Sequence, residues 1–239
     1  MAAGYETFGF RTREPFGEFA DFGALAKHYG LDEFVGDVPD GSVFDIGPFV
    51  GDSTFAFSQR LPGRRILCLE PDPTNRQRLI ENIRLNNLVD VEVIAKGAAS
   101  EPARLPVARP GTAGCTVQPL ESAEHFIEVD TVDRIAEGNG IKRVGLIKLD
   151  IEGFEANALR GAKATIKRDR PMVIVAAYHR GADIFELPGL LREMVPEYQF
   201  RFRHLDPRFP CSEYVIIALP PSQRITNGNR PSATLPSTP

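Results

Sequence analysis

Seven short apolar runs, most of them separated by amphipathic stretches, dominate the chain from Ser42 onward. The runs that we predict as β-strands are 42–46, 65–69, 91–95, 144–149, 172–177, 198–204 and 214–219. The stretches that we predict as α-helices are 53–60, 75–86, 154–168 and 187–195. Strands alternating with helices predict an α/β fold whose mostly parallel sheet carries helices on both faces. The last two runs have no helical stretch between them, so we expect an antiparallel hairpin at the sheet edge.

Three segments fall outside this pattern and flank or interrupt a domain predicted at 41–220. Residues 1–40 are rich in phenylalanine and tyrosine, and we expect them to form a cap with a helix around 18–29. Residues 100–124 have no clear period and contain many prolines and glycines, which indicates an irregular insertion with a functional role or high mobility. Residues 221–239 are mostly polar, proline and glycine, and are expected to form a disordered tail.

Composition excludes several classes of protein. The 28 Lys and Arg residues are balanced by 32 Asp and Glu residues, so the net charge of -4 does not favour nucleic acid as a partner. We expect no membrane span and no export signal, and hence a cytoplasmic location. Cys68, Cys115 and Cys211 have no CxxC spacing and are odd in number, which argues against a disulfide framework or a zinc site. We expect them to be small buried or half-buried side chains.

The first predicted strand ends in a loop with the features of a nucleotide-type cradle. Asp45, Gly47 and Gly51 lie in this loop, and Asp52 and Ser53 follow as candidates for capping a helix. The glycines allow a sharp turn and a close approach of the backbone to a ligand. Their spacing matches neither the dinucleotide fingerprint nor a Walker loop. The acid inside the turn would repel a pyrophosphate and suits a ligand that carries an ammonium or sulfonium group.

A second acidic residue stands where a ribose is commonly bound. Glu70 ends the second predicted strand, 25 positions after Asp45. In dinucleotide-binding units, an acid at a comparable place accepts hydrogen bonds from the ribose hydroxyls. The order and spacing of the loop and Glu70 therefore favour ligand binding over two unrelated structural features.

The fourth predicted strand, 144–149, ends in three alternating charges. Lys148, Asp150 and Glu152 are expected to share one face or edge. Burying three charges without partners is costly, so we place them in the crevice beyond the strand ends, where open α/β sheets bind ligands. The alternative is a structural pair in which Lys148 and a carboxylate lock the strand to a helix.

From Val43 to Leu219 the chain resembles the FkbM-type S-adenosylmethionine-dependent methyltransferases. The motifs that carry this resemblance are Phe44-Asp45-Ile46-Gly47, Gly51-Asp52-Ser53-Thr54, Leu69-Glu70-Pro71, Val129-Asp130-Thr131-Val132-Asp133, Ile147-Lys148-Leu149-Asp150-Ile151-Glu152-Gly153 followed by Glu155, Ala158-Leu159-Arg160-Gly161-Ala162 and Tyr178-His179. The Lys-x-Asp-x-Glu-Gly run is the most specific of them. The chain departs from the family at Pro48-Phe49, where Ala-Asn is common, so one backbone N–H and one side-chain amide are absent.

The resemblance implies a Rossmann-like class I methyltransferase, with a seven-stranded sheet whose last strand is antiparallel. It implies O-methyl transfer from S-adenosylmethionine to a hydroxyl of a small molecule, sugar or glycan. By position, the residues expected around the methionine part of the cofactor are Asp45, Gly47, Gly51, Asp52 and Ser53. Glu70 is expected at the ribose, and Lys96, Gly97 and Ala98 near the adenine.

Methyl transfer to a hydroxyl requires an aligned acceptor and removal of its proton. The candidate bases are Asp150 and His179, with Lys148 as a further catalytic candidate and Glu152 as a residue that contacts substrate or a metal. His179 could instead be a hydrogen-bonded histidine at a strand end. A divalent metal on Asp150 and Glu152 is conceivable but not favoured, because the sequence offers no second clear carboxylate cluster. The competing functions are a nicotinamide-dependent oxidoreductase, which the glycine spacing disfavours, and a non-catalytic binding protein of the same fold.

Overall fold

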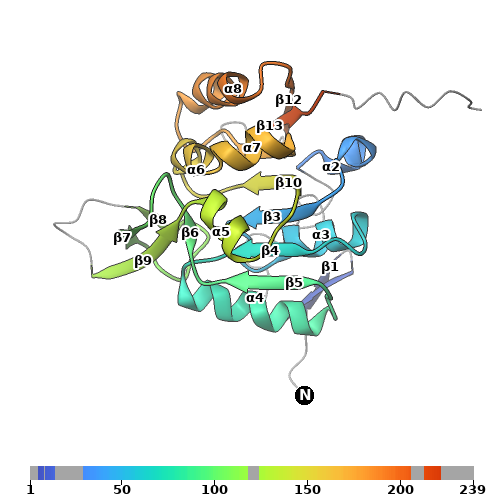
Figure 1. The fold of residues 1–239 in the computed structure, drawn as a ribbon. Helices are drawn as coiled ribbons and strands as arrows, with labels where there is room; N and C mark the ends of the chain where they lie inside the picture. The colour runs from blue at the N-terminus through green and yellow to red at the C-terminus, as the bar shows by residue number, and fades with distance from the viewer. Residues whose placement is uncertain (1–4, 8, 14–28, 118–123, 206–212, 222–239) are drawn as a thin grey trace, which may run out of the picture.

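The computed structural model describes residues 5–7, 9–13, 29–117, 124–205 and 213–221. Most of them form a three-layer α/β domain built on a seven-stranded mixed sheet (Figure 1). The expected helix around 18–29 and the expected tail at 221–239 lie almost wholly outside the described residues, and Cys211 lies outside them as well. None of the helices in the described part of the chain is long and apolar enough to cross a membrane.

All seven predicted strands are present in the main sheet, which has the order β12-β13-β11-β10-β3-β4-β5. Their bounds are β3 (Ser42–Ile46), β4 (Ile66–Leu69), β5 (Val91–Ile94), β10 (Val144–Leu149), β11 (Met172–Ala176), β12 (Gln199–His204) and β13 (Tyr214–Leu219). Strands β5, β4, β3, β10 and β11 pair in parallel, whereas β13 pairs antiparallel with both β11 and β12. The expected terminal hairpin is confirmed, with β12 at the sheet edge.

Helices cover both faces of this sheet, as its sequence pattern predicts. One face carries α2 (Leu31–Phe34), the 3-10 helix η2 (Val35–Asp37), α3 (Asp52–Arg60) and α4 (Pro73–Leu85). The other face carries α5 (Val132–Gly138), α6 (Glu155–Gly161), α7 (Lys163–Asp169) and α8 (Asp183–Met194). Alternation along the strands fills two separate cores: Phe44 and Ile46 pack with the second set of helices, and Val43 packs with the first set.

The single helix predicted at 154–168 is wrong in one respect, because two helices occupy this stretch. Gly161 lies against the backbone carbonyl of Ala99, where an added Cβ would be 1.8 Å from the oxygen. Ala162 then has non-helical dihedral angles (φ −102°, ψ 5°) and separates α6 from α7. Ala158 and Ile166 nevertheless pack into the same core, which is why the apolar period continues across the break.

The expectation that the segment 100–124 is irregular holds for 109–115, which has no helix or strand, but is wrong for the stretches on either side. The segment contains β7 (Ala103–Ala108) and β8 (Thr116–Val117), which join β6 (Gly97–Ala98) and β9 (His125–Asp130) in a four-stranded sheet. Pro106 interrupts the apolar run of β7, and a proline inside a run argues against a strand. Figure 1 shows this second sheet beside the ends of β3 and β10.

Asp72 ties the second sheet to the main domain. One of its carboxylate oxygens caps α4 by accepting from the N–H groups of Thr74 and Asn75, both at 2.9 Å. The other oxygen accepts from the N–H of Gly111 (3.0 Å), which lies between β7 and β8. The insertion is thereby held against the end of β4.

Aromatic residues of the N-terminal segment pack on α3 where the structure describes them. Phe10, in the two-stranded sheet of β1 (Tyr5–Thr7) and β2 (Phe10–Thr12), lies 5.5 Å from Phe55 between ring centroids. Tyr29 is buried beside Phe57 at 6.5 Å. This N-terminal segment therefore covers the main domain at two points, close to the loop after β3.

Candidate functional site

The loop after β3 has a backbone conformation that few side chains allow. Gly47 (φ 74°), Phe49 (φ 50°) and Gly51 (φ 94°) lie in the left-handed region, which glycine adopts without strain. A Cβ atom on Gly47 would lie 2.0 Å from the backbone oxygen of Asp150, so this glycine also lets the loops after β3 and β10 touch. The N–H of Gly51 donates to the carbonyl of Pro48 (2.8 Å), and α3 begins directly afterwards.

A buried ion pair lies beneath this loop. Nζ of Lys148 is 3.3 Å from Oδ1 of Asp45 and donates to the carbonyl of Gly47 (2.6 Å). Oδ2 of Asp45 accepts from the hydroxyls of Ser53 and Thr54, both at 2.7 Å. Burial alone would lower the pKa of Lys148, but nearby carboxylates, Asp45 foremost, raise it. The pair joins two strands, the loop and α3, which is the structural alternative considered for Lys148.

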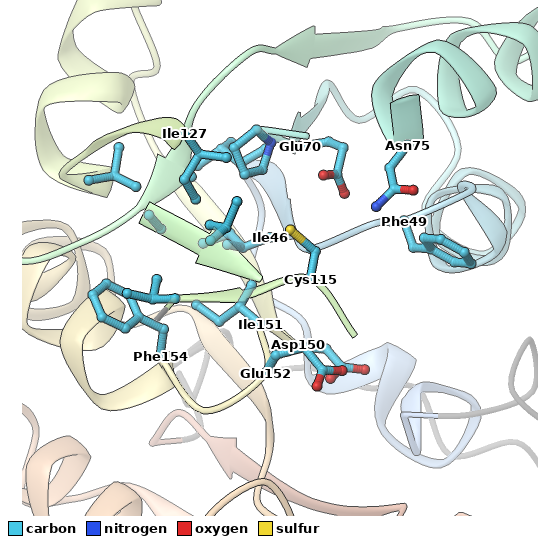
Figure 2. Close-up of a pocket in the computed structure, with 18 of the residues that line it drawn as sticks. Ile46, Phe49, Glu70, Asn75, Cys115, Ile127, Asp150, Ile151, Glu152 and Phe154 are labelled. Atoms are coloured by element: carbon cyan, nitrogen blue, oxygen red, sulfur yellow. The ribbon is translucent and has the colours of Figure 1, made fainter. Parts of the chain in front are cut away.

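A pocket lies next to the loop, at the carboxyl ends of β3, β4 and β10. About 660 Å³ of space unoccupied by atoms lies within it, and this volume includes open solvent. Glu70 and Asn75 lie on one side of it, and Asp150 and Glu152 on the opposite side (Figure 2). The rest of the wall is largely apolar and includes Ile46, Phe49, Val107, Cys115, Ile127, Val129, Ile151 and Phe154. A ligand in this pocket would meet polar groups at its two ends and apolar groups between them.

The polar side near β4 contains an unused acceptor. Glu70 is buried and accepts from the N–H of Asp72 (3.0 Å), and burial raises the pKa of Glu70 to about 7. The amide of Asn75 donates to the carbonyl of Thr112 (3.0 Å), but the side-chain oxygen of Asn75 is buried with no hydrogen-bond partner among the described residues. Because buried polar atoms are normally hydrogen-bonded, this oxygen fits a donor group on a ligand.

A third buried acid begins α3. Asp52 lies directly after Gly51, and its pKa is raised to about 7 because burial outweighs the opposing charge of Lys148. Asp52 and Glu70 therefore both change from the neutral to the negatively charged form as the pH rises through about 7.

The opposite side of the pocket is a network of acidic, phenolic and imidazole groups. The hydroxyl of Tyr29 donates to Oδ2 of Asp150 (3.0 Å), and that of Tyr178 donates to Oδ1 (3.4 Å). Nδ1 of His179 lies 2.8 Å from Oε1 of Glu155. Burial alone would lower the pKa of His179, but the carboxylates around it, including Glu152 and Glu155, raise it to about 10. The network links the ends of β10 and β11 to α6 and to the N-terminal segment.

The structure brings about half of the predicted site residues to the pocket wall. Those that line it are Gly47, Glu70, Gly97, Ala98, Asp150 and Glu152. Those that are buried beneath the loop are Asp45, Asp52, Ser53 and Lys148. Gly51 packs towards Leu79, Lys96 forms an ion pair with Asp130 (2.8 Å), and His179 contacts Asp150 from behind the wall. The predicted alternation stops at Leu149, where β10 ends, and Glu152 has a left-handed backbone (φ 56°).

Sequence reasoning missed four residues of the site. Asn75 and Cys115 line the pocket, and Tyr29 and Glu155 hold its acidic side. Glu155 is part of the Asp-x-Glu-Gly-x-Glu pattern, so its spacing is a usable signal. Tyr29 lies 121 positions from its partner and gives none. Cys68 is buried and Cys115 half-buried, and both are free, as expected.

The fold and the site define a class I methyltransferase-like α/β protein. Its parallel sheet has one reversed strand next to the edge, and a glycine loop and acidic residues lie at the carboxyl ends of the strands. The model of the methyltransferase FkbM domain matches residues 45–202. The chain therefore belongs to the FkbM methyltransferase family, and the match excludes the N-terminal segment that contains Tyr29.

Two relatives agree with this assignment. "Methyltransferase 1" of Beauveria bassiana (strain ARSEF 2860) is 28% identical over 151 residues, which cover 53% of this chain and 61% of that protein. The crystal structure of methyltransferase FkbM from Methylobacillus flagellatus KT is similar at a TM-score of 0.60 and 25% identity, covering 75% of this chain and 43% of that chain. The chain thus spans less than two thirds of either relative.

The fold also occurs in more distant proteins. The O-methyltransferase from Bacillus cereus in complex with SAH has a TM-score of 0.50 and 17% identity, covering 82% of this chain and 80% of that chain. At this identity the likeness concerns the fold alone.

Proposed function

We propose that the protein transfers a methyl group from S-adenosylmethionine to a hydroxyl of a small molecule, sugar or glycan. The observation that carries the proposal is one pocket, in an FkbM methyltransferase domain, with Glu70 on one side and Asp150 and Glu152 on the other. A parallel sheet binds ligands at this end of its strands. The hydroxyl as acceptor and the named classes of acceptor follow from the family resemblance.

The residues present fit this cofactor. The ribose carries hydroxyl donors, which suit the carboxylate of Glu70 and the free side-chain oxygen of Asn75. The adenine is a flat, largely apolar group, which suits Gly97, Ala98 and the apolar wall. The ammonium and sulfonium are cationic, which suits a pocket with Asp150 and Glu152 on its wall and with Asp52 buried beneath the adjoining glycine loop.

The transfer itself is an in-line displacement for which the cofactor supplies a methyl group on a positively charged sulfur. When bound, the cofactor would give its methyl carbon to the acceptor oxygen as the carbon–oxygen bond forms, and the electron pair of the broken carbon–sulfur bond would stay on sulfur. The hydroxyl proton passes to the network on the Asp150 side, where Asp150 is the proposed acceptor because it lines the pocket; His179, whose pKa is raised to about 10, contacts Asp150 from behind the wall and is proposed to stabilise its charge. Lys148 is proposed to act indirectly, by fixing the loop through Asp45 and Gly47.

Calorimetry tests cofactor binding and separates this function from the alternatives. We expect S-adenosylmethionine to bind with one-to-one stoichiometry and NAD to show no binding, because acids in the loop repel a pyrophosphate. Glu70→Gln should weaken S-adenosylmethionine about tenfold or more, since a charge-assisted hydrogen bond is replaced by a weaker one. The control is Glu101→Gln, an exposed acid of the insertion. Binding of NAD with no binding of S-adenosylmethionine would favour the oxidoreductase.

The same titration should depend on pH. Asp52 and Glu70 have pKa values raised to about 7, so both are largely protonated at pH 6 and ionised at pH 8. Affinity for a cationic ligand should therefore rise with pH, by about tenfold for each carboxyl group that must ionise. Glu70→Gln should reduce the pH dependence. An affinity that is flat or falls over this range would contradict the roles of both acids.

In the protein without a ligand, a rise in pH should have an unfavourable effect through these two groups, because it lowers the free energy of unfolding. A carboxyl group whose pKa is raised on folding keeps a proton that the unfolded chain has released. The contribution of Asp52 and Glu70 to stability should therefore fall as pH rises from their unfolded pKa values near 4 to about 7.

A further inference from the structure

His179 presents a buried ring nitrogen that has no hydrogen-bond partner among the described residues. Its side chain is 7% exposed, and its Nδ1 lies 2.8 Å from Oε1 of Glu155. Glu155 is fully buried and fixed, because the same Oε1 also accepts from the N–H of Ile151 (2.8 Å). When the imidazole is neutral and its proton lies on Nδ1, directed at Glu155, the other nitrogen, Nε2, carries the free electron pair. Within the part of the chain that the structure describes, Nε2 is buried and unpartnered.

This nitrogen faces two carboxylates. Nε2 lies 3.5 Å from Oδ1 of Asp150 and 3.6 Å from Oε1 of Glu152, and both distances are longer than a hydrogen bond between such atoms. Electron pairs that face one another at such spacing repel unless a proton or a metal ion lies between them. Ligand atoms on neighbouring positions of an octahedral metal are about 3 Å apart, given bonds of about 2.1 Å, so a small relaxation accommodates an ion.

We propose that Nε2 of His179 and the carboxylates of Asp150 and Glu152 bind a divalent metal cation, and that Glu155 orients the imidazole for this purpose. The arrangement in which a carboxylate accepts from the far nitrogen of a ligating histidine is the usual one in metal sites. One imidazole with two carboxylates suits first-row ions such as Mn²⁺. Tyr29 and Tyr178 hold Asp150 in place for this role.

A catalytic role for this cation rests on the proposed methyl transfer, whereas the binding of the cation to the protein does not. A metal on Nε2 occupies the electron pair that a general base needs, so Asp150 is then the remaining proton acceptor of the two candidates. A bound cation would also lower the pKa of an acceptor hydroxyl placed against it. The sequence alone disfavours a metal because it offers no second cluster of carboxylates. The fold supplies a further ligand, His179, from beyond the end of β11.

The test uses the full chain, freed of metal by a chelator and titrated with MnCl₂ alone. The free Mn²⁺ signal in electron paramagnetic resonance should fall until one equivalent is bound, and pulsed spectra should show coupling to an imidazole nitrogen. His179→Gln should abolish the nitrogen coupling. Asp150→Asn should weaken binding at least tenfold, and Glu155→Gln about 10–100-fold, as for carboxylates behind ligating histidines. Glu193→Gln, an exposed acid on α8, should change nothing.

Two results would overturn the proposal. One is bound Mn²⁺ without nitrogen coupling in the wild-type protein, which would place the ion elsewhere. The other is no Mn²⁺ binding, with nitrogen NMR showing His179 protonated on both nitrogens, because the cation between these groups is then a proton. Both results come from the wild-type protein, so they hold even where a variant does not fold. Neither depends on methyl transfer, so the proposed function stands or falls separately.

Discussion

Replacing Lys148 with methionine is expected to lower the free energy of unfolding by about 3–5 kcal/mol, because it leaves a buried carboxylate without its cation. Asp45 is 0% exposed and Lys148 1% exposed, and their charged atoms are 3.3 Å apart. Two hydroxyl donors, from Ser53 and Thr54, remain on Asp45 in the variant but carry no full charge. Urea denaturation followed by circular dichroism measures the change.

Two companion variants isolate the cause. In Asp45→Asn/Lys148→Met no unpaired charge remains, so this double variant should regain a large part of the lost stability. Lys163→Met removes an exposed lysine of α7 and should change stability by no more than about 0.5 kcal/mol. If Lys148→Met were as stable as Lys163→Met, the pair of Lys148 and Asp45 would not be what holds the loop after β3 to the sheet.

Replacing Gly47 with alanine is expected to destabilise the protein by more than about 4 kcal/mol or to prevent folding. The left-handed backbone at φ 74° costs an alanine about 1–2 kcal/mol. The steric clash costs more, because the added Cβ would lie 2.0 Å from the backbone oxygen of Asp150 and 3.0 Å from its carbonyl carbon. Relief of the clash requires the loop after β3 and the loop after β10 to separate, which would move Asp150 and open the pocket.

Gly63 provides a matched control. It has the same φ of 74°, but an added Cβ there meets no atom within 4 Å among the described residues. Gly63→Ala should therefore cost only the backbone strain, and the difference between the two variants measures the clash. Equal unfolding free energies for Gly47→Ala and Gly63→Ala would show that the two loops do not pack as described.

The main sheet is predictable because its signals are local. A parallel strand buried on both faces is a short apolar run, and runs such as 42–46 and 144–149 match β3 and β10 at both ends. The second sheet is not predictable in this way. β7 contains Pro106, and β8 is two residues long, so neither has a period that identifies a strand. β7 pairs antiparallel with β8 on one side and with β9 on the other, and no local pattern in the sequence indicates either pairing.

The same distinction between local and non-local signals applies to the residues of the site. Glu70 and Asp150 follow strands, so their place at the carboxyl edge of the sheet follows from the strand assignment. Asn75 is part of a helix pattern, and Tyr29 belongs to a segment that only the fold brings back over β10. The role of Lys148 requires a measured distance, since an alternating pattern cannot tell a buried ion pair from a catalytic group.

Methyl transfer is the most direct test of the proposed function. The protein would be incubated with S-adenosylmethionine tritiated on the transferred methyl, a divalent cation, and a panel of saccharides and hydroxylated metabolites, including a mixed glycan extract. We predict that label enters at least one hydroxyl acceptor, and that Asp150→Asn and His179→Asn each lower this rate about 10²-fold or more. Absence of label in every acceptor, or wild-type rates in both variants, would contradict the proposed function.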